Sequence, residues 1–212
     1  TNGYSTRSHG IAVGLQQAGW KVRATTRPGF PWDAGVKGLA SGYHEAEVDG
    51  VTYAAAAGWE LNKTPLDHYL AAAADHYLRE AQSSGAEVIV AASNHITALP
   101  ALLAARRLGL PFVYEVRGLW EVTQASTEPE WADSERYQLM RSLEQQAARE
   151  ADLVLTLTEE LADELASWGV PRDRIELIPN AVDGERFRPM ARDEEIARKL
   201  GLRPGVPVIG YA

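Results

Sequence analysis

The sequence predicts an α/β domain with a Rossmann-like open parallel sheet and helices on both faces. Four short segments, 87–92, 112–116, 152–157 and 175–178, have the continuous apolar character of strands that are buried on both sides. Segments of 10–20 residues with helical periodicity separate these strands. This alternation is typical of successive βαβ units, in which each helix joins two parallel strands.

The segment before these units is predicted to hold one helix and three strands. Residues 3–18 have an apolar face with helical spacing, and Gly19 ends the helix. A short strand at 20–26 comes next, followed by a loop rich in Gly and Pro that extends to about residue 42. Asp49-Gly50 lies between two alternating runs within 43–57, which predicts a β-hairpin.

The longest predicted helix covers 64–84, with Thr64 as its N-cap, Pro65 in its first turn and Gly85 as its stop. Its apolar residues favour burial in the core over a membrane surface, because no belt of Lys or Arg accompanies them. Further helices are predicted at 96–108, 133–150, 159–168 and 193–200.

Both ends of the sequence are unusual for such a domain. The chain opens with a glycine-containing loop and a helix where a strand is expected, so we expect a first strand to be missing. Residues 207–212 have the character of a strand that starts something new. We therefore expect a Rossmann-like domain over 1–190, followed at 191–212 by a linker and the start of a second domain that is absent.

Composition excludes several classes of protein. The 212 residues are 45% hydrophobic, which suits a folded core and argues against disorder, and the net charge of −8 disfavours nucleic acid as a partner. The absence of cysteine excludes disulfides, thiolate metal sites and Cys nucleophiles. The sequence has no HExxH motif, metal-spaced His pair, GxSxG motif or GxxxxGK(S/T) motif, and no apolar run is long enough to span a membrane. We expect a soluble globular protein, compatible with a reducing cytosol.

The first candidate site is the turn that enters the first helix, where Asn2, Gly3 and Tyr4 precede Ser5, Thr6 and Arg7. Backbone N–H groups and the positive end of the helix dipole can hold an anion there. Gly3 allows a ligand to approach the backbone closely, and Arg7 adds a donor. His9 lies one turn further along. The alternative is a plain helix cap, with Arg7 solvated and His9 a surface or packed residue.

The second candidate site is Ser93-Asn94-His95, which follows a predicted strand. Ligands of open α/β sheets bind beyond the carboxyl ends of the strands, so polar residues there are candidates for contact with a ligand. The alternative is a helix cap, in which Ser93 or Asn94 caps the helix at 96–108 and His95 has no role.

The third candidate site follows the next strand. Glu115 lies inside that strand and must be either paired or exposed on an edge, and Arg117, Trp120 and Glu121 fall on the predicted loop after it. Together they offer a clamp for phosphate or carboxylate, a stacking face for a sugar ring and a carboxylate for hydroxyl groups. The alternative is a salt bridge between Arg117 and Glu115 with Trp120 packed beneath it.

The fourth candidate is the Pro-Asn turn after the last strand. It is interpreted as a structural turn in which Asp183 caps a helical turn and Phe187 anchors it, with Asn180 as a candidate for the cleft.

Tryptophans add two further predictions. Trp20 and Trp168 are expected in the core, whereas Trp32 and Trp59 lie in predicted loops and are candidates for contact with a sugar or a lipid surface.

Four motifs in order make the sequence similar to a known family. The runs "NGYSTRSHGIAVGLQQAGWKVRATTR", "YEVRGLWE", "LEQQAAREADLVLTLTEELADEL" and "IPNAVDGERFRP" resemble the N-terminal domain of family 4 (group 1) glycosyltransferases over nearly the whole chain. The resemblance implies one half of a GT-B fold, in which two Rossmann-like domains face each other across a cleft. It also implies a retaining transferase that uses a nucleotide-diphospho-sugar donor, needs no metal or other cofactor, and binds the acceptor mainly in this half.

The resemblance also assigns roles to residues. Asn2, Gly3 and Tyr4 match the family's Gly-rich loop near the donor diphosphate, with Asn2-Gly3 where many members have Gly-Gly. Arg117 stands where many members carry a histidine near the reacting sugar, so we expect it to stabilise the departing diphosphate and assign it no role as a base. Asn180 matches the family's PNGVD turn. The family's carboxylate pair and phosphate-binding Arg or Lys belong to the second domain, so the fragment alone is expected to be inactive.

Two other functions remain open from the sequence. One is a non-catalytic Rossmann-like module that binds a nucleotide or sugar, and the other is a related GT-B enzyme such as a nucleotide-sugar epimerase. The family acts on lipid-linked sugars, polysaccharide precursors and small metabolites. A lipid acceptor would place the enzyme at the inner face of the membrane, with Trp32 and Trp59 as candidate contacts. The donor sugar, the acceptor and the oligomeric state are not predicted.

Overall fold

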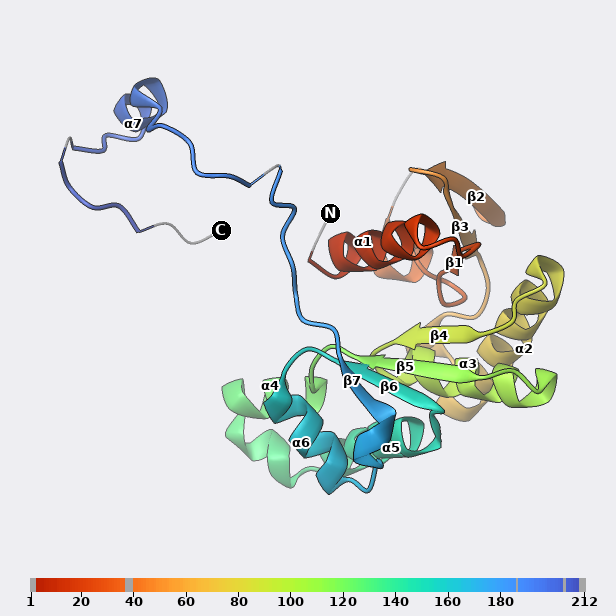
Figure 1. Cartoon of the computed structure of the whole chain (residues 1–212). Helices are drawn as coiled ribbons and strands as arrows, with labels where there is room; N and C mark the ends of the chain where they lie inside the picture. Colours follow the sequence, from red (N-terminus) through yellow and green to blue (C-terminus); the bar gives the residue numbers. More distant parts are fainter. Residues whose placement is uncertain (1–2, 37–39, 186, 204, 210–212) are drawn as a thin grey trace. The chain divides into compact units, whose positions relative to one another are not determined.

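The computed structural model describes residues 3–36, 40–185, 187–203 and 205–209 (Figure 1). The chain divides into two compact units, Thr1–Pro179 and Asn180–Ala212. The predicted residue Asn2 and the last three residues of the predicted strand at 207–212 lie outside the described residues. Residues 205–209 have no regular secondary structure.

The first unit is built around a four-stranded sheet in the order β4-β5-β6-β7. These strands are Ile89–Ala92, Phe112–Val116, Leu153–Thr156 and Ile175–Leu177. Every neighbouring pair is parallel, with Ala91 opposite Tyr114 and Tyr114 opposite Val154. The predicted parallel sheet of four apolar strands is therefore confirmed, since each strand lies within one of the predicted segments.

A second, three-stranded sheet has the order β1-β3-β2. β1 (Arg23–Thr25) is parallel to β3 (Val51–Ala56), and β2 (Tyr43–Val48) is antiparallel to β3. Asp49 and Gly50 join β2 to β3 with φ angles of 51° and 78°. Positive φ at both central residues is the requirement of a two-residue hairpin turn, so the Asp-Gly prediction is confirmed.

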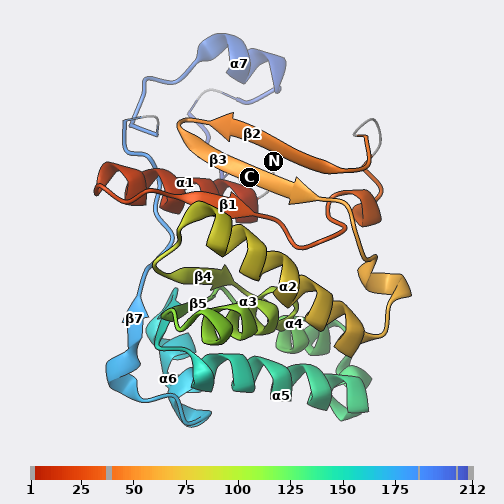
Figure 2. The same ribbon diagram turned by 90° about the vertical axis from the view of Figure 1, so that its right-hand side faces the viewer.

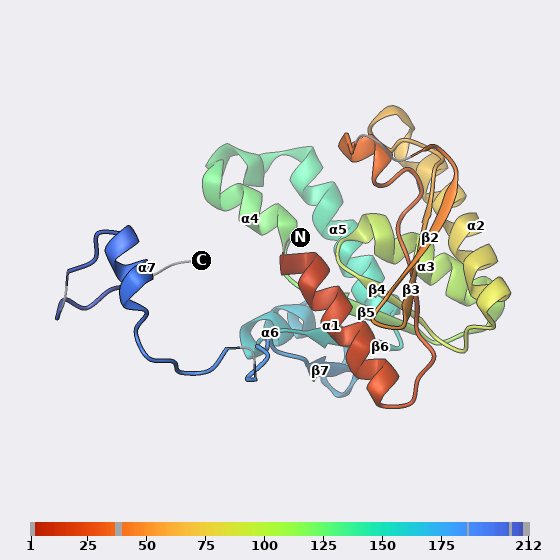
Figure 3. The same ribbon diagram turned by 90° about the horizontal axis from the view of Figure 1, so that it is seen from above.

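Helices cover both faces of the four-stranded sheet. α3 (His95–Leu108) and α5 (Glu135–Glu150) pack on one face, with α2 (Leu66–Ser84) against α3 (Figure 2). α1 (Gly3–Gln17) lies on the opposite face (Figure 3). Successive residues of a strand point to opposite faces, so Tyr114 of β5 meets Glu144 of α5 while Glu115 meets Arg7 of α1.

The remaining elements are short. α6 (Glu159–Ser167) packs against β7, and α4 (Trp120–Thr127) is followed by the 3₁₀ turn η3 (Pro129–Asp133). Three other 3₁₀ turns are η1 (Trp32–Ala34), η2 (Leu61–Lys63) and η4 (Arg172–Arg174). In the second unit α7 (Glu194–Lys199) confirms the predicted charged helix, and Asp193 caps it by accepting hydrogen bonds from the N–H groups of Glu195 and Ile196.

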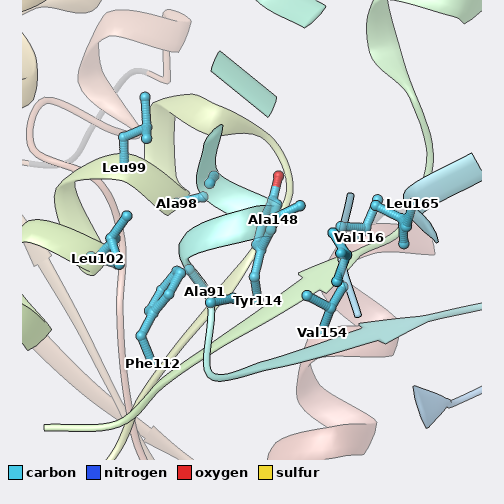
Figure 4. Close-up of a cluster of buried hydrophobic side chains, with 14 of the residues drawn as sticks. Ala91, Ala98, Leu99, Leu102, Phe112, Tyr114, Val116, Ala148, Val154 and Leu165 are labelled. Carbon is cyan, nitrogen blue, oxygen red and sulfur yellow. The ribbon is translucent and has the colours of Figure 1, made fainter. Parts of the chain in front are cut away.

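The main core lies between the sheet and the layer of α3, α5 and α6 (Figure 4). Phe112, Tyr114 and Val154 of the strands are fully buried against small and branched residues of these helices. Trp168 is buried in this core, as predicted. The same prediction for Trp20 is wrong, because Trp20 is 55% exposed in the connection between α1 and β1, where no element covers it.

Two local predictions are also corrected. Thr64 does not cap α2, because Pro65 occupies the cap position and the Thr64 hydroxyl donates instead to the carbonyl of Glu60. The segment after β5 was expected to be a loop, but it forms α4, which has little apolar periodicity to reveal it. Gly85 does end α2, in the left-handed conformation that favours glycine.

Candidate functional site

The candidate site lies at the edge of the four-stranded sheet where the carboxyl ends of the parallel strands meet. The start of α1 lies at this edge, where Arg117, just after β5, donates to the carbonyl of Tyr4. Arg7 fixes it there, because its Nη2 donates to the carbonyl of Ile178 at 2.7 Å and its Nη1 to that of Pro179 at 3.1 Å. These carbonyls follow directly after β7, so α1 is bonded to the end of the last strand.

A network of three charged side chains holds this edge together, and we call it the Glu115 network: Arg7, Glu115 and Arg117. Glu115 Oε1 accepts from Arg7 Nε at 2.8 Å, while Oε2 accepts from Arg117 Nε at 2.9 Å and Nη2 at 2.6 Å. The side chains are 5%, 11% and 7% exposed for Glu115, Arg7 and Arg117. Of the two possibilities left open for Glu115, the structure has the paired one, and Arg7 is buried instead of solvated.

Arg117 also holds the first turns of α1. Its Nη1 donates to Ser8 Oγ at 2.8 Å and to the carbonyl of Tyr4 at 3.3 Å, and its backbone N–H donates to Ser93 Oγ at 3.1 Å. The salt bridge of the alternative interpretation is therefore present, but Trp120 does not pack beneath it. With so many donors engaged, the guanidinium serves chiefly to join β5 to α1.

The start of α1 is open. A Cβ at Gly3 would meet no atom within 4 Å, and Tyr4 is 57% exposed. Early N–H groups of a helix have no partner within the helix, so this end can receive an anion. Ser5, Thr6 and Arg7 each make interactions within the protein, so these side chains also have a structural role.

The second candidate site is used mainly inside the fold. Asn94 caps α3, because its Oδ1 accepts from the N–H of Ile96 at 3.2 Å. His95 is buried, and both its backbone N–H, at 2.6 Å, and its ring Nδ1, at 2.9 Å, contact Glu144 Oε1. The helix-cap alternative is confirmed for Asn94, whereas His95 has a specific partner that the alternative did not foresee.

Trp120 and Glu121 are neighbours in sequence with opposite environments. Trp120 is 56% exposed at the start of α4, and Glu121 is 0% exposed. A carboxyl in that position cannot reach a hydroxyl group of a ligand in solution. Burial, first, and the nearby Glu144 raise the pKa of Glu121, which favours the neutral acid.

Four further predicted residues are His9, Asn180, Trp59 and Trp32. His9 contacts the β2–β3 hairpin, with its Nδ1 2.7 Å from the Tyr53 hydroxyl and its Nε2 2.8 Å from Asp49 Oδ2. Asn180 belongs to the second unit, in which the N–H of Glu185 donates to Asp183 Oδ1 as expected for a cap of this turn. Trp59 is exposed, whereas Trp32 donates from Nε1 to the carbonyl of Ala40 at 3.2 Å.

Sequence reasoning missed Glu144, the carboxylate on which His95 and the Tyr114 hydroxyl converge. A signal for it existed. Glu144 lies three and four residues before Ala147 and Ala148, which puts all three on one face of α5, and all three are buried. A carboxylate on the small-residue face of a helix indicates a buried partner.

The described residues hold neither a candidate metal centre nor a helix suited to spanning a membrane. Within the parts of the chain that the structure describes, no group of three or more His, Asp or Glu side chains is arranged to hold a metal ion. None of the helices found there combines the length and the apolar character that crossing a membrane requires.

A parallel sheet covered on both faces, with a helix start held at its carboxyl edge, defines a Rossmann-like domain of the kind that forms one half of a GT-B glycosyltransferase. The sequence agrees with this class. The chain belongs to the family of glycosyl transferase 4-like domains, whose model matches residues 2–181.

Individual relatives are similar over different parts of the chain. The D-inositol 3-phosphate glycosyltransferase of Nocardia farcinica (strain IFM 10152) is 40% identical over 70 residues, which are 32% of this chain and 15% of that protein. The structure of sucrose-phosphate synthase from Thermosynechococcus elongatus has a TM-score of 0.67 at 17% identity, covering 98% of this chain and 49% of that one. This chain therefore spans about half the length of that solved structure and a smaller part of the curated relative.

Proposed function

We propose that this chain is the acceptor-side half of a retaining glycosyltransferase, which moves a sugar from a nucleotide-diphospho-sugar to a glycan, lipid-linked or small-molecule acceptor. Membership of the glycosyl transferase 4-like family supports the transfer reaction. The observation that carries the site assignment is the open start of α1, which the Glu115 network fixes at the carboxyl edge of the sheet.

The donor diphosphate is proposed to approach the first turn of α1 at Gly3 and Tyr4, and Asn2, which precedes α1 in the sequence, is proposed to take part. The N–H groups of that turn and the positive end of the helix dipole stabilise the charge that develops on the departing diphosphate, and no metal or other cofactor is invoked. The acceptor hydroxyl attacks the sugar from the face that the diphosphate leaves, so a phosphate oxygen can take its proton. This route needs no base from the present chain.

The acceptor is proposed to contact the exposed aromatic rings near this edge. Tyr4 and Trp120 present their rings to solvent, and aromatic faces stack on the apolar faces of sugars. The hydrogen bond from Arg117 to the Tyr4 carbonyl links the first of these residues to the segment that leads into the second. Asn180, which belongs to the second unit, is also proposed to contact the acceptor.

Arg117 is proposed to act through α1 and not on the phosphate itself, which makes it a positioning residue. Its replacement is therefore expected to lower both turnover and stability. Lysine cannot reproduce the paired hydrogen bonds to Glu115, so Arg117→Lys is expected not to restore turnover.

The decisive experiment compares Gly3→Val with Gly10→Val in the full-length protein that carries this chain. Both glycines lie in α1 and neither has an atom within 4 Å of an added Cβ, so the two variants should fold equally well. We expect Gly3→Val to reduce transfer from a panel of nucleotide sugars at least tenfold, while Gly10→Val keeps the parental rate. Equal rates for the two variants would refute the role of Gly3.

Product analysis separates the other functions. NMR of the product reports whether the anomeric configuration of the sugar is retained. A protein that binds nucleotide sugars but transfers none is a binding module, and one that changes the sugar without an acceptor is an epimerase. Location at the inner face of the membrane is proposed for a lipid acceptor, with Trp59 as the exposed contact. A protein that stays with the soluble fraction during liposome flotation would contradict that location.

A further inference from the structure

The helix α4 is anchored in an unusual way. Among its eight residues, all of them described, Glu121 is the buried one. Trp120 and Val122 on either side of it are 56% and 41% exposed. A surface helix normally turns an apolar stripe toward the protein, whereas α4 turns a carboxyl group inward.

Among the described residues, no other residue donates a hydrogen bond to the carboxyl group of Glu121. Both of its oxygens are buried, and the indole N–H of Trp131 in η3, which packs against α4, is also buried and has no partner there. Buried polar groups in native proteins are usually paired, so an unpaired carboxyl needs an explanation.

The groups around Glu121 come from three elements. Glu144 and Arg141 belong to α5, His95 to α3, and Tyr114 to β5. Glu144 already accepts hydrogen bonds from the His95 backbone N–H at 2.6 Å and from the Tyr114 hydroxyl. Glu144 is therefore supplied with donors by these neighbours, whereas the carboxyl of Glu121 receives none from them.

These conditions favour the neutral form of Glu121. Loss of hydration on burial raises its pKa most, and the charge of Glu144 raises it further. The backbone N–H of Glu121 itself, Arg141 and His95 act in the opposite direction but do not cancel these two effects. A neutral carboxyl can stay inside at modest cost, whereas a bare carboxylate would be drawn to water.

We propose that Glu121 is a positioning residue, whose neutral carboxyl holds α4 in register and so turns Trp120 outward at the carboxyl edge of the sheet. Consecutive residues of an α-helix are about 100° apart around its axis, so fixing one fixes the direction of the next. Ionisation of Glu121 then releases the first turn of α4 and with it Trp120. The link to acceptor binding rests on the proposed function, but the positioning itself does not.

The sign of the pH effect follows from the raised pKa of Glu121. The folded chain holds this proton to a higher pH than the unfolded chain does, so stability falls as pH rises through the window between the two pKa values. Glu121→Gln removes the ionisation and keeps the shape, so it is expected to remove this part of the pH dependence.

The test uses this chain with ¹³C-labelled glutamate carboxyls and ¹⁹F-labelled tryptophan. We expect one glutamate signal to titrate above the others and to vanish in Glu121→Gln. The Trp120 signal, assigned with Trp120→Phe, is expected to shift with the same midpoint in the parent chain and not to shift in Glu121→Gln. Glu128→Gln removes an exposed carboxyl just after α4 and should leave both titrations unchanged.

Two results would overturn the proposal. One is a Glu121 signal that titrates together with the exposed glutamates, and the other is a Trp120 signal that does not shift when Glu121 ionises. Even if Glu121→Gln does not fold, a parent titration in which no glutamate signal titrates above the others refutes the proposal. Neither readout involves a sugar. If both titrations behave as expected and the affinity for the acceptor is independent of Trp120, the positioning stands and the proposed acceptor contact is wrong.

Discussion

Glu115→Gln should be among the most damaging substitutions of a charged residue in the first unit. It removes the negative charge that two arginines share, yet keeps the size of the side chain. Arg7 and Arg117 are 11% and 7% exposed, so water cannot replace the lost partner fully. Removing one member of a buried ion pair typically costs about 3–5 kcal/mol, because the remaining charge is left uncompensated. The remaining bonds from Arg7 to two carbonyls place the expected loss near the lower end of this range.

Urea denaturation of the parent and variant chains measures this loss as a change in the free energy of unfolding. The matched control is Asp75→Asn, which breaks an ion pair with Arg107 that has a distance of 2.6 Å but side chains 57% and 48% exposed. Exposed pairs contribute about 0–1 kcal/mol, so the control should change little. Equal losses for the two variants would refute the claim that burial of the Glu115 network supports the site.

Three further outcomes are expected from unfolding measurements on the chain. Gly29→Ala should destabilise the first unit by about 1–3 kcal/mol, because φ is +85° and a new Cβ would lie 2.5 Å from the carbonyl oxygen of Trp59; an unchanged melting temperature would contradict this. Gly14→Ala, in the middle of α1 with open space around it, should instead stabilise by about 0.5–1 kcal/mol, and a lower melting temperature would count against it. Hydrogen bonds from Arg106, first, and from a backbone N–H of β5 lower the pKa of Asp152 below 3.8. The stability that the ionised Asp152 gives to the folded chain is therefore present above that pH and is lost as pH falls through the lowered pKa. Asp152→Asn should therefore weaken the acid dependence of unfolding, and an identical pH profile would show that this carboxylate contributes nothing.

The strands and most helices could be predicted because their signals are local. The four apolar segments of the parallel sheet and the Asp49-Gly50 turn each occupy a few consecutive residues. Helix stops were equally local, since Gly85 and Gly109 both adopt the left-handed conformation that favours glycine.

The site was harder to predict because its contacts join distant residues. Arg7 and Glu115 are 108 positions apart, and nothing near either residue indicates the other. The burial of individual side chains could not be predicted either. Trp120 and Glu121 are adjacent in the sequence, and only the packing of α4 on its neighbours decides which of them is buried. For the same reason the open choice for Glu115, paired or exposed, could not be made before its partners were known.

The bond from Arg7 to the end of β7 has a consequence for the order of folding. Arg7 is made before its partner, because the carbonyl of Ile178 follows 171 residues later in the chain. At about 5–20 residues per second, the ribosome leaves α1 without this anchor for roughly ten to thirty seconds. The long separation also makes closure of the edge a late event in refolding, since contacts between distant residues form slowly. α1 thus reaches its final place late, and its open start is fixed at the carboxyl edge of the sheet only once β7 has been added.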